Sequence, residues 1–210
     1  MASSFIDQTP VIIYLLQKLK PKKILDIGKG MGKYGFLLHE YLGIDNTKKI
    51  DPSKTLKELS NIVVDAVEVD EDLMLPHLSQ IYNKVYFGDI LKIRDDLPQY
   101  DLILMIDIIE HINKEEAILA LKSFLQKGSD IIIATPINFF NQDLYESEFE
   151  HHVSHWTIKD LNKLGFVEVQ YLNGGAVYLL TNKKIVIRGF GNSFIKKLRR
   201  VGRSIMNELK

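Results

Sequence analysis

Residues 22–35 read KKILDIGKGMGKYG, and this stretch decides the fold of the chain. It begins with an apolar run that is typical of a buried strand and contains one acid, Asp26. Glycines follow at positions 28, 30 and 32, and helix-forming residues resume at Lys33. A strand that turns so tightly into a helix needs residues without a Cβ, because the backbone must turn sharply and leave room for a ligand. The stretch therefore predicts a strand, a ligand-binding turn and a helix.

The spacing of these glycines separates two classes of nucleotide cofactor. A dinucleotide fingerprint, G-x-G-x-x-G, would need a glycine at position 33, where this chain has a lysine. The observed pattern, Asp-x-Gly-x-Gly-x-Gly over residues 26–32, instead resembles motif I of the class I S-adenosylmethionine (SAM)-dependent methyltransferases. The resemblance implies SAM as the cofactor and a Rossmann-like sheet as the fold.

Apolar runs along the rest of the chain predict the same architecture independently. Five short runs alternate with helical patterns, at residues 22–28, 62–70, 84–90, 100–108 and 129–136. This alternation indicates a mostly parallel sheet with helices on both faces. Two further runs, 166–172 and 176–182, are separated only by Asn173-Gly174-Gly175 and should form an antiparallel hairpin. The predicted fold class is therefore α/β, with a seven-stranded, mostly parallel sheet and a C-terminal antiparallel hairpin.

Local signals place the helices between these strands. Thr9-Pro10 should start a helix over residues 11–20 that Pro21 stops. Asn113 with Glu116 three residues later should cap another helix. The polar segment 43–61 has no helical or strand pattern, and we interpret it as an insertion or long loop.

Acidic residues at strand ends provide candidates for cofactor binding, because ligands of open α/β sheets lie beyond the carboxyl ends of the strands. The resemblance implies that Glu68 accepts hydrogen bonds from the ribose hydroxyls, with Asp70 as the alternative. It also implies that Asp89 receives the adenine amino group and that Asp107 lies beside the methyl-transfer site. SAM carries a sulfonium cation, an amino group and hydroxyls, which suit carboxylates. The expected cofactor-binding residues are Asp26, Gly28, Gly30, Gly32, Glu68, Asp89 and Asp107.

Histidines after the fourth strand provide candidates for catalysis. Residues 107–111, DIIEH, resemble the Asp-Val-Leu-Glu-His segment of many small-molecule methyltransferases. A hydroxyl acceptor must lose a proton, and histidine beside a carboxylate is a suitable base near neutral pH. His111 beside Glu110 is the first candidate, and His152 beside Glu150 is the second. The expected catalytic residues are thus His111, Asp107 and His152, although His111 could instead anchor the helix that follows it.

The resemblance covers roughly residues 8–182 and extends to a bacterial group of methyltransferases that accompanies glycan biosynthesis. It implies methyl transfer to the oxygen of a small molecule or glycan. A protein or RNA methyltransferase is the alternative enzyme, but residues 106–109 hold no Asn-Pro-Pro-aromatic motif for amino-group methylation. A non-catalytic SAM-fold binding protein is the alternative from another class. His151, His152 and His155 with nearby glutamates could suggest a metal, but no cysteine completes a zinc set, so we predict none.

The net charge of zero over 210 residues hides an asymmetry. The segment 183–210 has a net charge of +8, and the preceding 182 residues have −8. We therefore expect a methyltransferase domain over 1–182 and a basic extension over 183–210. Residues 192–209 show an apolar helical stripe among basic residues, which would suit an anionic membrane surface, a partner or the chain's own domain. No cysteine and no signal-peptide pattern are present, so we expect a cytoplasmic protein, peripheral to a membrane if the extension binds one.

Overall fold

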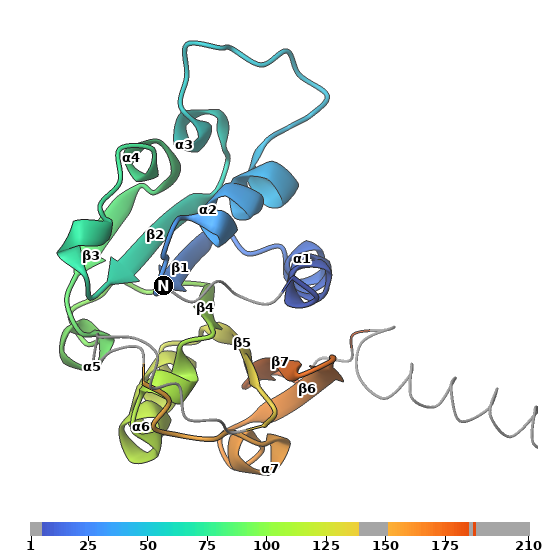
Figure 1. The fold of residues 1–210 in the computed structure, drawn as a ribbon. Coiled ribbons are helices and arrows are strands. Elements are labelled where there is room, and N and C mark those ends of the chain that lie inside the picture. The colour runs from blue at the N-terminus through green and yellow to red at the C-terminus, as the bar shows by residue number, and fades with distance from the viewer. Residues whose placement is uncertain (1–5, 139–150, 185–186, 188–210) are drawn as a thin grey trace, which may run out of the picture.

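The computed structural model describes residues 6–138, 151–184 and 187, which contain one seven-stranded sheet with the order β3-β2-β1-β4-β5-β7-β6 (Figure 1). Strands β1 to β5 are parallel, and β7 is antiparallel to both β5 and β6. The predicted fold class is therefore confirmed. The strands are β1 (Lys23–Ile27), β2 (Val63–Glu68), β3 (Lys84–Phe87), β4 (Leu102–Ile106), β5 (Asp130–Pro136), β6 (Phe166–Tyr171) and β7 (Gly175–Thr181).

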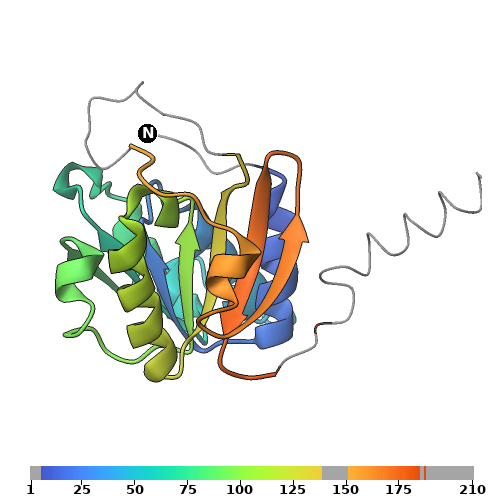
Figure 2. The same cartoon turned by 90° about the horizontal axis from the view of Figure 1, so that it is seen from below.

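Helices cover both faces of the sheet, as Figure 2 shows. One face packs against α1 (Gln8–Leu19), α2 (Lys33–Leu38) and α4 (Leu78–Ile81), and the other against α5 (Ile90–Ile93), α6 (Lys114–Gln126) and α7 (Ile158–Leu161). Side chains of β4 alternate between the two layers, because successive strand residues point to opposite faces. Leu102 and Leu104 belong to the first layer, and Ile103 and Met105 to the second. A strand apolar on both faces must be central, which is where β4 lies.

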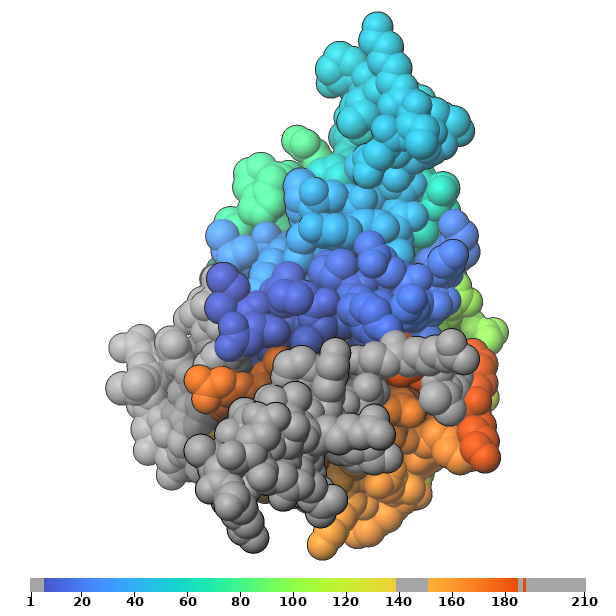
Figure 3. Space-filling view, turned by 90° about the vertical axis from the view of Figure 1, so that its right-hand side faces the viewer, coloured from blue at the N-terminus to red at the C-terminus, as the bar shows by residue number. Residues whose placement is uncertain are grey.

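The segment after α2 differs from the loop that the sequence predicted. Helix α2 continues into a π-helical turn, η1 (His39–Gly43), and the chain then leaves the body of the molecule (Figures 1 and 3). It holds one short helix, α3 (Leu56–Leu59), which the sequence interpretation missed. Thr55 and Glu58 form a capping box, with the Thr55 backbone N–H 2.7 Å from the Glu58 carboxylate. These polar residues cap the start of the short helix, which therefore forms without a large apolar face.

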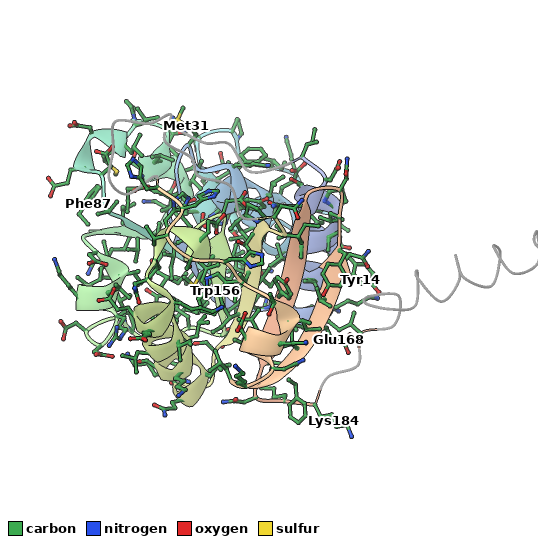
Figure 4. All side chains as sticks on the ribbon, turned by 60° about the horizontal axis from the view of Figure 1, so that its bottom comes forward. Tyr14, Met31, Phe87, Trp156, Glu168 and Lys184 are labelled. Atoms are coloured by element: carbon green, nitrogen blue, oxygen red, sulfur yellow. The ribbon has the colours of Figure 1, made fainter. Side chains whose placement is uncertain are left out.

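The first helix begins at Gln8, before the predicted start at Thr9-Pro10, and it ends at Leu19. The predicted helix after Asn113 is confirmed. The Asn113 side chain accepts from the Glu115 backbone N–H at the start of α6. Two short helices, η2 (Glu71–Leu73) and α4, lie on either side of Pro76, a residue that helix interiors disfavour. Helix α5 was not predicted, since it is a single turn that Asp89 caps. Trp156 is 1% exposed and lies in the interior, while Met31 and Phe87 lie at the outer edge (Figure 4).

The predicted basic helix over 192–209 lies outside the described residues, as do Glu148 and Glu150. The membrane, partner or intramolecular role of that segment stays a prediction. Among the residues that the structure describes, no helix is both long and apolar enough to span a bilayer.

Candidate active site

A cavity of about 480 Å³ lies at the carboxyl ends of β1, β2, β3 and β4. This volume suits a nucleotide-sized ligand, and the position is where open α/β sheets bind theirs. A larger groove of about 1140 Å³ runs between α1 and α2 along the outer side of the glycine turn, but none of the strand-end acids lines it. The smaller cavity is therefore the candidate cofactor site. Its walls include Gly28, Gly30, Glu68, Asp70, Gly88, Asp89, Asp107, Ile108 and His111.

The glycine turn forms one wall of this cavity in a conformation that other residues adopt with strain. Gly28, Gly30 and Gly32 have φ values of 70°, 48° and 84°. A Cβ on Gly28 would lie 2.0 Å from Cδ1 of Ile108, which also lines the cavity. Gly32 lines the larger groove instead, where a Cβ would meet Leu78 at 2.5 Å. The structure thus gives Gly28 and Gly30 a place in the cavity and Gly32 a packing role beside it.

Glu68 at the end of β2 fastens the glycine turn to the neighbouring strand. It is 5% exposed, and its carboxylate accepts from the backbone N–H groups of Gly30, Val69 and Asp70 at 3.3, 2.9 and 3.3 Å. A carboxylate that bonds three N–H groups is held in one orientation. Glu68 therefore has a structural function in the cavity wall whatever it binds there.

Lys29, which occupies a position between the glycines, is the buried partner of Glu68. Its Nζ lies 3.7 Å from the Glu68 carboxylate and donates to the Leu73 carbonyl at 3.0 Å. Desolvation lowers the pKa of Lys29, and the charge of Glu68 opposes that change. The Lys29 side chain has no solvent exposure, and its charge is paired with that of Glu68.

Asp26 does not line the cavity, although motif I includes it. It is 3% exposed and accepts a hydrogen bond of 2.5 Å from the Tyr82 hydroxyl. Burial raises the pKa of Asp26 to about 7, and the charge of Glu68 adds to the rise while the Tyr82 hydrogen bond opposes it. Asp26 therefore links β1 to Tyr82, the residue that follows α4.

Replacing Asp26 by asparagine should change the pH dependence of stability. Because folding raises the pKa of Asp26 from 3.8 to about 7, its contribution is full below pH 4 and is lost as pH rises towards 7. A rise of this size corresponds to about 4 kcal/mol of the free energy of unfolding as an upper bound. Urea unfolding between pH 4 and 8 should therefore show that the free energy of unfolding of Asp26→Asn rises relative to that of the wild type as the pH increases. Asp96→Asn, at an exposed carboxyl, is the control; parallel curves for the wild type and Asp26→Asn would contradict the prediction.

The other acids of the cavity have different local functions. Asp89 caps α5 by accepting from the Leu91 backbone N–H at 2.9 Å. Asp70 accepts from the Asp72 N–H at 3.0 Å at the start of η2. Both line the cavity. Each carboxylate has a second oxygen, so capping leaves it able to accept from a ligand as well.

Asp107 occupies a strained backbone position at the end of β4. Its φ of 53° is unusual for a residue other than glycine. The Gln8 amide donates to its Oδ1 at 3.0 Å, which ties the start of α1 to the wall of the cavity. Strained residues persist only where their surroundings hold them, and they gather at functional sites. Sequence reasoning missed Gln8, because nothing in its local pattern signals a contact 99 residues away.

His111 and His152 come together beside this end of the cavity. Their ring centroids are 4.9 Å apart, and His111 lines the cavity while His152 is 8% exposed. Both therefore lie beside the end of β4, where the methyl-transfer site was expected. Glu110 beside them is 3% exposed. Burial raises the pKa of Glu110 to about 8, with a further contribution from the charge of Asp107 and a smaller opposing one from the Thr135 hydroxyl.

The segment that brings His152 here is held by several bonds to the turn η3 (Ile109–His111). The Glu110 carbonyl accepts from the Val153 and Ser154 backbone N–H groups at 2.8 and 3.0 Å. The Ile109 carbonyl accepts from the Trp156 indole N–H at 3.2 Å. Trp156 thus orients the histidine segment from the interior, a function that its sequence context did not reveal.

The parallel sheet, the glycine turn and the acids at successive strand ends define the class I methyltransferase architecture. A family model described as a methyltransferase domain matches residues 9–165. The chain belongs to this family, and it is a SAM-dependent methyltransferase.

Several solved structures share the fold at low sequence identity, and none of the curated proteins matches the sequence. The methyltransferase domain of bacterial CtHen1-C has a TM-score of 0.53 and 16% identity, over 83% of this chain and 96% of that one. The N-terminal domain of EvdMO1, solved with S-adenosylhomocysteine (SAH) bound, has a TM-score of 0.57 and 13% identity, over 82% of this chain and 80% of that one. A protein from Burkholderia thailandensis, described as an O-methyltransferase family protein, has a TM-score of 0.55 and 8% identity, over 85% of this chain and 57% of that one. At these identities the likeness shows the fold.

Proposed function

We propose that this enzyme transfers the methyl group of SAM to a hydroxyl oxygen of a small molecule or sugar. The observation that carries the proposal is that one cavity is lined by the glycine turn, by Glu68 and Asp89, and at its β4 end by Asp107 and His111. Groups suited to a nucleoside and a group suited to a hydroxyl thus share one cavity. The description of the Burkholderia protein as an O-methyltransferase family protein supports the choice of oxygen.

The residues of the cavity divide into two functional groups. Glu68 and Asp89 would accept from the ribose and the adenine amino group, while the backbone of Gly28 and Gly30 allows the cofactor to approach closely. Bound SAM supplies an electrophilic methyl group next to a positively charged sulfur. Asp107 lies near that charge, and His111 faces the acceptor, where an imidazole can lower the barrier to losing the hydroxyl proton. The histidine pair and the β4 turn also limit how the acceptor can approach, which aligns its oxygen with the methyl group.

Calorimetry and turnover test this assignment in two steps. SAM and SAH should bind the full chain and NAD should not, because Lys33 stands where a dinucleotide turn needs glycine. Release of SAH in the presence of hydroxyl compounds, sugars among them, would then establish the acceptor class. Equal affinity for NAD would overturn the cofactor site. SAM binding without any product would favour the alternative of a non-catalytic binding protein, and product formed only with protein or RNA would favour the other enzyme class.

A further inference from the structure

A cluster of three side chains lies beside the cavity, and the proposed chemistry assigns no function to one of them, Glu110. The cluster consists of Glu110, His111 and His152. Each offers one ligand atom, and the three atoms all lie within 4.8 Å of one another. The cluster draws on two separate chain segments, which hydrogen bonds from Val153 and Ser154 to the Glu110 carbonyl hold together. The three side chains are thus placed by the fold itself.

The Glu110 carboxylate supplies an independent observation. It is 3% exposed, and although the Thr135 hydroxyl lies near it, neither of its oxygens has a hydrogen-bond partner of good geometry among the described residues. Buried carboxylates are nearly always bonded, because losing water without a replacement is costly. A cation beside Glu110 would replace the missing donors.

His111 has the tautomer that a metal ligand needs. Nδ1 of His111 lies 3.1 Å from the His151 carbonyl oxygen, which can only accept. In the neutral ring the proton is therefore on Nδ1, and the lone pair is on Nε2, which is the arrangement of a metal-bound histidine held by an outer hydrogen bond. Ligands of one ion at about 2.1 Å lie roughly 3–3.5 Å apart, so modest side-chain rotations would bring these atoms into range.

We propose that Glu110, His111 and His152 bind one divalent transition-metal ion, and that this ion receives the acceptor hydroxyl. Two imidazoles and one carboxylate suit Mn²⁺, Fe²⁺, Co²⁺ or Zn²⁺ and leave positions open. This site reverses the expectation of no metal, which considered His151 and His155 rather than Glu110 and His111. An acceptor with two neighbouring hydroxyls, such as a sugar, would fill two open positions.

With the ion in place, His111 acts as a metal ligand and not as the base. This inference rests on the proposed methyl transfer to oxygen. The acceptor hydroxyl loses its proton to a water molecule, which the charge of the ion favours. The oxygen then forms a bond to the methyl carbon, and the carbon–sulfur bond breaks with its electron pair remaining on sulfur. The products are the methyl ether, SAH and a hydrated proton.

Binding of Co²⁺ to the chelator-treated full chain tests the site without using activity. Calorimetry should show one equivalent, and the visible absorption bands of the bound ion should report nitrogen and oxygen ligands. Glu110→Gln and His152→Ala should each weaken Co²⁺ binding at least about tenfold. His155→Ala is the control, because that ring bonds the Ile137 carbonyl outside the cluster.

Two comparisons keep the test decisive. SAH binding measured on the same samples should be unchanged in Glu110→Gln, which separates failure of the metal site from failure of the cofactor site. If Glu110→Gln does not fold, His152→Ala carries the comparison. Absence of Co²⁺ binding to the wild type, or equal losses in His155→Ala, would overturn the proposal.

Discussion

Replacing His111 by alanine is expected to lower turnover by about 10²–10⁴-fold while leaving SAH affinity nearly unchanged. The reason is position: the imidazole lines the cavity at the end of β4, next to Asp107 and 4.9 Å from the ring of His152. A group there acts on the acceptor, and the cofactor's ribose and adenine are assigned to other strand ends. The rate of methyl transfer should fall whether the imidazole takes the proton itself or binds the proposed metal ion.

Turnover of His111→Ala is measured as SAH release with a hydroxyl acceptor, and affinity by calorimetry with SAH. His155→Ala, in the same segment as His152 but outside the cluster, is the control and should keep its rate. If His111→Ala turns over normally, His111 is only an anchor for α6, and the chemistry belongs to His152 or needs no base.

Removal of Glu68 should have the largest effect on cofactor binding. Glu68→Ala is expected to weaken SAM binding by about 1.5–3 kcal/mol, the scale of hydrogen bonds to a charged group. It should also lower the free energy of unfolding by about 3–5 kcal/mol, because Lys29 is left buried without its partner. Calorimetry measures the first effect and urea unfolding the second.

A double variant separates these two consequences. Lys29→Met with Glu68→Leu removes both charges and should recover much of the stability, because no unpaired charge stays buried. It should not recover SAM binding, since no carboxylate faces the ribose. Asp70→Ala, at the other acid of this wall, is the matched control. A larger loss of SAM affinity in Asp70→Ala than in Glu68→Ala would assign the ribose to Asp70.

The local sequence determined the elements that short-range physics controls. Residues 26–32 set the strand, the turn and the helix because only glycine tolerates three positive φ values so closely spaced. Continuous apolar runs determined that β4 and β5 are buried on both faces, and Asn173-Gly174-Gly175 determined the hairpin. Short helices without apolar periodicity, α3 and α5, could not be predicted this way, because capping residues alone are a weak signal.

The tertiary structure decided the partners of each functional side chain. The sequence grouped Asp26 with the cofactor residues, but in the fold it bonds Tyr82 and does not line the cavity. It paired His152 with Glu150, which lies outside the described residues, and it did not foresee that the fold brings His152 to His111 and Glu110. The placement of β7 between β5 and β6 was likewise undetermined by local pattern. Strand ends fix which residues face the ligand, but contacts between segments far apart in the chain depend on how those segments pack, and no local periodicity encodes that.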